Sequence, residues 1–115
     1  SSLYLNGEDY IFTYTPPVNQ TVDITLTGTD AYTGVFLFDG CPTSGGTCVT
    51  NNTSVSVDPS LCGVNITAGT TYYIVISTNP APDCTPFYLS IRENIISTIN
   101  SNCKIGNYSV SSNSQ

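Results

Sequence analysis

The chain has 115 residues, with 2 basic and 8 acidic side chains and a formal net charge of -6. A chain of this length forms one domain and buries roughly two-thirds of its unfolded surface. The shortage of Lys and Arg argues against nucleic acid and against an anionic membrane surface, because nothing could neutralise the phosphates. No apolar run is long enough to span a bilayer, so we expect no direct membrane insertion.

Alternating side chains predict short strands in the first third of the chain. Residues 10–14 place aromatic rings on one face, and Pro16-Pro17 ends that strand because neither proline can donate to a ladder. Residues 21–27 alternate aliphatic and polar side chains, which is typical of a half-buried antiparallel strand. Residues 35–38 are apolar throughout, so we place them inside a sheet.

The stretch from Gly63 to Ser77, GVNITAGTTYYIVIS, carries the clearest strand pattern. It indicates two strands joined by a turn at Ala68-Gly69-Thr70, where Gly69 can adopt a positive φ. The second strand is apolar on both faces. We therefore predict a hairpin placed centrally in a sheet, with Ile74 and Ile76 among the most buried residues.

Later segments extend the same pattern. A weaker strand is expected within residues 51–59, with Val55 and Val57 inward, and residues 87–91 alternate clearly. About eight short strands with Gly, Pro and Asn turns predict an all-β fold, an antiparallel β-sandwich. We assign residues 1–92 to this core. Residues 93–115 form an extension that is a completing strand, a linker or an inter-subunit strand.

The five cysteines, without any histidine, indicate disulfides formed in an oxidising compartment. No Cys-x-x-Cys pair is present, which argues against zinc. We predict that Cys41 and Cys48 close a small loop, and that antiparallel pairing of the hairpin brings Cys62 near Cys84. Cys103 is then left over, either free or bonded to another chain.

Catalytic and metal-binding chemistry has few candidates. Without histidine a hydrolytic triad lacks its usual base, and the adjacent Glu8 and Asp9 would point to opposite faces of a strand. We expect no enzyme and no cofactor other than calcium. Its candidate oxygen ligands are Glu8, Asp9, Asp30 and Asp39. The alternative is that these carboxylates are solvated turn residues.

Tyrosine is frequent, with 8 copies in a chain of low charge. Such rings can form a stacking platform for carbohydrate or protein. The candidates are Tyr10, Tyr14, Tyr73 and Tyr88. The alternative is that tyrosine fills half-buried sheet positions, for which it has high propensity.

Acceptor sequences for N-glycosylation recur along the chain. They begin at Asn19, Asn51, Asn52, Asn65 and Asn107. In a chain so rich in Ser and Thr, about three would arise by chance. The alternative is that most of them carry no glycan.

Four segments follow one another in a characteristic order. They are Asp9-Tyr10 with Phe12, Phe36-Leu37-Phe38-Asp39, Ala68-Gly69-Thr70 with Tyr72-Tyr73-Ile74, and Tyr88-Leu89-Ser90-Ile91. Together they resemble the bacterial pre-peptidase C-terminal domain family, over residues 7–92. The cysteine pairs and the tail depart from that pattern and are similar to versions in large surface proteins of gliding-type bacteria. The resemblance implies a sandwich of jelly-roll type that is a non-catalytic accessory module of exported proteins.

These observations predict a non-catalytic structural or adhesive module of an exported protein or surface filament, extracellular or at the cell surface. Its expected partners are other copies of itself or neighbouring modules. Apolar residues beyond Glu93 could add as a strand to a neighbour's edge, which would build a filament. The alternative is an accessory domain of a secreted hydrolase that binds extracellular polysaccharide or protein.

Overall fold

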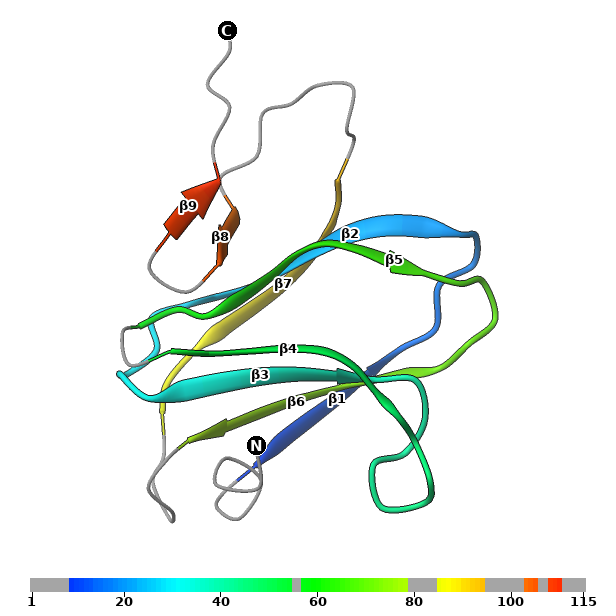
Figure 1. Cartoon of the computed structure of the whole chain (residues 1–115), viewed down its shortest axis with the longest axis horizontal. Helices are drawn as coiled ribbons and strands as arrows, with labels where there is room; N and C mark the ends of the chain where they lie inside the picture. The colour runs from blue at the N-terminus through cyan, green and yellow to red at the C-terminus, as the bar shows by residue number, and fades with distance from the viewer. Residues whose placement is uncertain (1–8, 55–56, 79–84, 95–102, 106–107, 111–115) are drawn as a thin grey trace, which may run out of the picture.

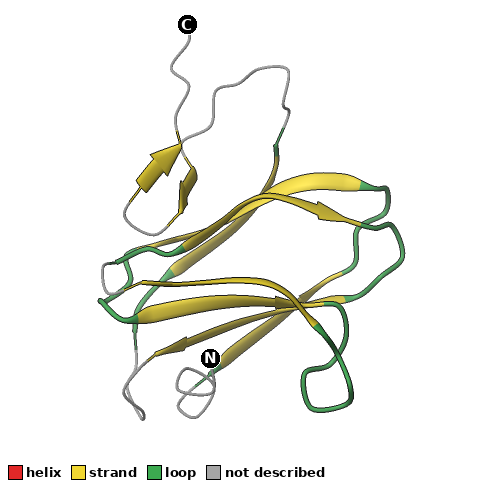
Figure 2. Ribbon diagram, viewed as in Figure 1, coloured by secondary structure: helices red, strands yellow, loops and turns green. Residues whose placement is uncertain are grey.

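Two antiparallel sheets form the body of the computed structural model (Figure 1). The first has the strand order β1-β6-β3-β4 and the second the order β5-β2-β7. The structure describes residues 9–54, 57–78, 85–94, 103–105 and 108–110. Their strands are β1 (Tyr10–Tyr14), β2 (Gln20–Thr27), β3 (Thr33–Phe38), β4 (Cys48–Ser54), β5 (Ser60–Ile66), β6 (Tyr72–Thr78), β7 (Tyr88–Glu93), β8 (Cys103–Ile105) and β9 (Tyr108–Val110). The predicted all-β antiparallel sandwich is confirmed, and the described residues contain no helix (Figure 2).

None of the described residues therefore belongs to a helix that could cross a lipid bilayer. The tail adds a short hairpin, because β8 pairs with β9. β8 lies beside β5.

The facing sides of the two sheets form the main core. Alternate aliphatic residues supply it, as the strand period of two requires. Its fully buried members include Val22, Ile24, Leu26, Val35, Leu37, Leu61, Ile74 and Ile76. Ile74 and Ile76 are 1% and 0% exposed, which confirms their predicted burial. β6 is also central, since it pairs with β1 on one side and β3 on the other.

β3 is buried on both faces, as the apolar run at residues 35–38 predicts. Val35 and Leu37 face the main core. Phe36 and Phe38 point to the other side of the sheet and cluster there with Val75 of β6. The outer face of this sheet thus has a second, smaller apolar cluster.

β5 and β6 do not form the predicted hairpin. β5 pairs with β2 in one sheet, whereas β6 pairs with β1 and β3 in the other. The predicted turn is present, with Gly69 at φ 82°, but it carries the chain from one sheet to the other. There the Gly69 amide donates to the Pro16 carbonyl at 3.0 Å. A period of two identifies strands but not their partners, which is why the pairing was wrong.

The disulfide prediction for Cys62 was wrong for the same reason. Cys62 is bonded to Cys103, with 5.8 Å between their Cα atoms. The pairing with Cys84 required a β5–β6 hairpin, and these strands lie in different sheets. Cys84 itself lies outside the described residues. Cys103, predicted to be left over, instead fixes the tail hairpin to β5.

β5 has a bulge at Cys62, the residue that is bonded to the tail hairpin. The β2–β5 register shifts between Val22 and Ile24, so that Asp23 faces two residues of β5, Cys62 and Gly63. Gly63 has φ 64°, a conformation that glycine adopts without a steric penalty. Its amide donates to Asp23 Oδ1 at 2.8 Å, which holds the bulge in place.

The strand expected within residues 51–59 begins earlier, at Cys48. Val57 is 46% exposed and follows the strand, so its predicted inward placement was wrong. Val55 lies outside the described residues. Polar residues dominate β4, which among the described strands is at the edge of its sheet.

Candidate functional site

An exposed apolar surface lies along β1, which forms one end of its sheet. Tyr10, Ile11 and Phe12 are 40%, 56% and 40% exposed. Ile11 points to one face of β1, and Tyr10 and Phe12 point to the other. Phe87, in the loop just before β7, packs against Tyr10 and Phe12. Its ring makes edge-on contacts with Tyr10 at 5.2 Å and with Phe12 at 5.9 Å between centroids. We call Tyr10, Ile11, Phe12 and Phe87 the aromatic edge.

The four tyrosines predicted to bind a ligand do not form one platform. Tyr10 and Tyr14 lie on β1 and share a face with Phe12 by strand alternation. Tyr73 packs on the outer cluster of the β1-β6-β3-β4 sheet. Tyr88 is 80% exposed on β7, in the other sheet. Because the core lies between the sheets, Tyr73 and Tyr88 face opposite sides of the molecule.

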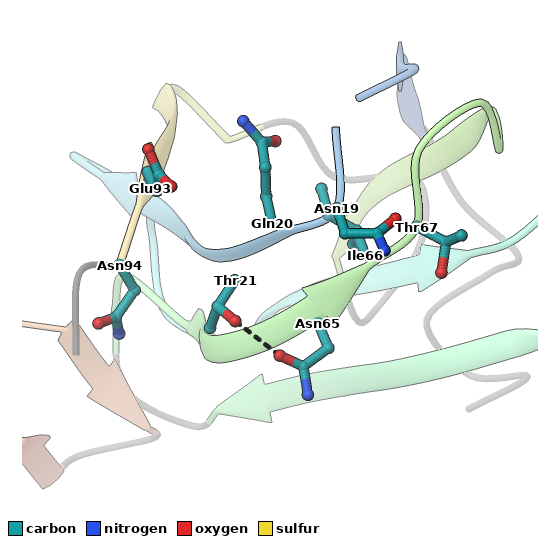
Figure 3. Close-up of a pocket in the computed structure, with 8 residues that line it drawn as sticks. All are labelled: Asn19, Gln20, Thr21, Asn65, Ile66, Thr67, Glu93 and Asn94. Atoms are coloured by element: carbon teal, nitrogen blue, oxygen red, sulfur yellow. Dashed lines mark hydrogen bonds between the residues drawn. The ribbon is translucent and has the colours of Figure 1, made fainter. Parts of the chain in front are cut away.

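A polar hollow of about 480 Å³ opens at one end of the β5-β2-β7 sheet (Figure 3). The start of β2 meets the ends of β5 and β7 there, because β2 is antiparallel to both. The lining residues, which define the polar hollow, are Asn19, Gln20, Thr21, Asn65, Ile66, Thr67, Glu93 and Asn94. Amides and hydroxyls dominate this lining, with one carboxylate.

Hydrogen bonds inside the protein orient three amide side chains of the polar hollow. The donor and acceptor pairs are the Ala68 amide to Asn19 Oδ1 (2.8 Å), the Thr21 hydroxyl to Asn65 Oδ1 (2.7 Å, dashed in Figure 3) and the Tyr14 hydroxyl to Gln20 Oε1 (3.0 Å). Each bond uses the amide oxygen. Within the described ranges, the three amide NH₂ groups make no hydrogen bond, so they remain available as donors.

Asn94 closes the polar hollow on the β7 side. Its backbone amide donates to the Thr21 carbonyl at 2.7 Å, and its Nδ2 donates to Asp23 Oδ1 at 3.0 Å. The neighbouring Glu93 is exposed and supplies a carboxylate that can only accept when ionised. The polar hollow therefore offers three oriented amide donors and one strong acceptor at the end of the sheet. Gln20 and Glu93 point to one face of the sheet, and Thr21 and Asn65 point to the other (Figure 3).

The candidate calcium ligands are spread over the molecule. Asp30 precedes β3 and Asp39 follows it, so a six-residue strand separates them. Asp39 accepts from the Thr47 amide at 2.8 Å, which is the turn role weighed as the alternative. Glu8 lies outside the described residues. Among those described, Asp9, Asp30 and Asp39 do not gather into a group of three metal-binding side chains, and calcium at them stays a prediction.

The candidate glycosylation sites differ in access. Asn19 and Asn65 are exposed and line the polar hollow. Asn51 and Asn52 lie on β4, where Asn52 Nδ2, the atom that would carry a glycan, donates to the first carbonyl of β5 at 2.9 Å. Asn107 lies outside the described residues. Glycosylation at the exposed sites stays a prediction.

Two free thiols border the β3–β4 loop, so the predicted Cys41–Cys48 bond is not present. Cys48 is opposite Phe38 in the β3–β4 hairpin, and Cys41 lies three residues after Phe38. Cys41 and Cys48 are therefore not directly opposite each other. Cys41 Sγ lies 3.3 Å from Thr43 Oγ1. Hydrogen bonds from Thr43 lower the pKa of the half-buried Cys41 thiol below its usual value.

No protein-family model, curated protein or solved structure matches the chain. The resemblance to the pre-peptidase C-terminal domain family thus stays a prediction. Among the described residues, the aromatic edge and the polar hollow are surfaces with distinct chemistry, one apolar and one polar.

Proposed function

We propose that this chain is a non-catalytic, extracellular β-sandwich module with a structural or adhesive role in an exported protein or surface filament. The observation that carries the proposal is the aromatic edge. Tyr10, Ile11 and Phe12 expose 40–56% of their surface on a strand that is at the edge of its sheet among the described strands. An exposed apolar edge strand is a site where another chain can add its own strand.

The Cys62–Cys103 disulfide supports the proposed extracellular location. Disulfides form and persist mainly in oxidising surroundings, such as the cell exterior. The charged fraction of 9% also favours an extracellular location, because about 25% is average for soluble domains. The likeness to accessory domains of exported proteins fits this placement and is part of the proposal.

Adhesion through the aromatic edge can be measured on coated surfaces. Wells carry the purified chain, cellulose or fibronectin, and retention of labelled chain is compared with that of an Ile11→Lys variant. A charge at this exposed position should disfavour strand addition without disturbing the core. Thr27→Lys, an exposed change in the other sheet, is the matched control. Loss of retention only in Ile11→Lys supports the proposal, and equal retention of all three proteins contradicts it.

The polar hollow favours a second candidate function, binding of a neutral carbohydrate. Oriented amide donors with a carboxylate at the same end of the sheet suit hydroxyl groups, each of which can donate and accept. The amide oxygens of Asn19, Gln20 and Asn65 already accept protein hydrogen bonds, so they are poor ligands for calcium. The Glu93 carboxylate and the net charge of -6 disfavour an anion.

Side-chain amide resonances report this second function directly. We expect cello-oligosaccharide to shift the Nδ2 signals of Asn19 and Asn65 in an NMR titration. Glu93→Gln should weaken the shifts, whereas Asn51→Ala on the distant β4 should not. A titration that leaves the Asn19 and Asn65 signals unmoved would reject carbohydrate of this class at the polar hollow.

A further inference from the structure

We propose that two copies of this chain associate by pairing their β1 strands antiparallel about a two-fold axis at Phe12. The two four-stranded sheets would then become one continuous sheet across the dimer. This inference rests on the proposed adhesive role of the aromatic edge and names its partner, a second copy. Such a contact is isologous and closes at two subunits, so a filament would need a further interface.

β1 is the described sheet edge best suited to this pairing. The edge strand β7 has Arg92 and Glu93 near its end, and charges on an edge oppose pairing. β5 has β8 beside it. Among the described strands β4 is also at an edge, but it carries Asn51 and Asn52 where β1 carries aromatic and aliphatic side chains. The five residues of β1 include no charge, proline or glycine.

The register follows from the ends of the strand. Residues opposite one another in a two-fold antiparallel pair have the same parity, so the axis must pass a single residue. An axis at Phe12 pairs all five residues of β1 with the five of the copy. An axis at Thr13 would place Pro16, which has no N–H, opposite Tyr10. An axis at Ile11 would leave Tyr14 opposite a residue before Asp9.

The side chains are self-complementary in this register. Phe12 meets Phe12 of the copy, and Tyr10 meets Tyr14, so aromatic rings face each other on one side of the sheet. Such cross-strand aromatic pairs stabilise sheets. Asp9 comes opposite Thr15 of the copy and not opposite its own equivalent. The acidic residues that flank the strand therefore do not oppose each other at the contact.

The strength of the contact is bounded by its size and charge. Five residue pairs make a small interface, of the class that buries less than about 1,200 Å² and is weak or transient. Each chain also has a net charge of -6, and the two copies repel. Because salt screens this repulsion, we expect the dimer fraction to rise between low and moderate ionic strength.

Engineered cysteines test both the partner and the register. In a background in which Cys41, Cys48 and Cys84 are replaced by Ser, Phe12→Cys should form a disulfide-linked dimer on mild oxidation, because residue 12 faces its own copy. Tyr10→Cys alone should stay monomeric, and so should Tyr14→Cys alone. A mixture of these two should give the cross-linked heterodimer. Dimers from Thr13→Cys and none from Phe12→Cys would overturn the register.

Sedimentation velocity of the unmodified chain tests the dimer without substitutions. We expect the mean mass to rise with concentration, and Ile11→Lys to abolish the rise while Thr27→Lys preserves it. A wild type that stays monomeric at millimolar concentration overturns the dimer. If Ile11→Lys still loses retention on cellulose or fibronectin, the adhesive role survives with another partner. If it also keeps full retention there, both proposals fail.

Discussion

Thr29 and Asp58 exchange two hydrogen bonds between loops that are far apart in the sequence. The Thr29 amide donates to Asp58 Oδ1 at 2.9 Å, and the Asp58 amide donates to Thr29 Oγ1 at 2.6 Å. Thr29 follows β2 and is buried, while Asp58 lies just before β5 and has φ 56°. Asp tolerates this left-handed conformation better than most residues. The pair thus ties the chain leaving β2 to the chain entering β5.

Replacement of Asp58 by Ala should destabilise the fold by about 1–3 kcal/mol, because the buried Thr29 amide loses its acceptor. Asp58→Asn keeps an acceptor oxygen and tolerates the backbone conformation, so it should retain most of the stability. Urea unfolding measures both values. An Asp58→Ala midpoint equal to that of the wild type would mean that this pair contributes nothing.

Replacement of Ser77, in contrast, should stabilise the fold. Its hydroxyl is buried on β6 and, within the described residues, has no hydrogen-bond partner. An unpaired buried hydroxyl is unfavourable, so Ser77→Ala should stabilise the fold by about 0.5–1 kcal/mol. Thermal unfolding measures the shift, with Ser90→Ala on β7 as the control. A lower melting temperature for Ser77→Ala would contradict this reading of the site.

The Cys62–Cys103 disulfide should contribute more to the free energy of unfolding than any of these hydrogen bonds. Cys62 and Cys103 close a loop with a sequence separation of 41. Restriction of the unfolded chain by such a loop is worth roughly 3–4 kcal/mol. Cys103→Ser should therefore lower the free energy of unfolding by about that amount. Cys41→Ser, at a free thiol, should change it little. Non-reducing peptide mapping should recover the Cys62–Cys103 linkage, and a linkage of Cys62 to Cys84 would contradict the structure.

The Cys41 thiol should react with alkylating reagents at a lower pH than an ordinary cysteine. Hydrogen bonds from Thr43 favour its thiolate, and this lowers the pKa. Thr43→Val removes the hydroxyl, so the midpoint of the pH–rate profile should move upward. Mass spectrometry of the peptide that contains Cys41 follows the reaction. Identical profiles for both proteins would exclude this role of Thr43.

Strand positions followed from the sequence because burial imposes a period of two that side chains report directly. Val22, Ile24 and Leu26 in β2, and Ile74 and Ile76 in β6, lie in the core as that period predicts. Partner choice did not follow, since any exposed backbone edge can accept any strand. The false hairpin between β5 and β6, and the false cysteine pair derived from it, share that origin.

The candidate surfaces were foreseen only in part. Alternation placed Tyr10 and Phe12 on one face, but it could not show that Phe87, in the loop just before β7, would pack against them. The polar hollow was missed because it joins three strand ends. Two acceptor triplets, beginning at Asn19 and Asn65, line it together. The sequence predicts each of them only as a separate glycosylation site, although both have the same Asn-x-Thr pattern.

The crossing of the chain between sheets has a consequence for folding during synthesis. Tyr10 pairs with Ile76, and Asp23 pairs with Arg92, so β1 acquires β6, and β2 acquires β7, only after long intervening segments have emerged. In the two main sheets, only β3 and β4 pair as consecutive strands. Topologies dominated by such distant pairs fold slowly, on the order of milliseconds to seconds. A chain that emerges from its N-terminus therefore keeps β1 without its ladder until β6 has appeared.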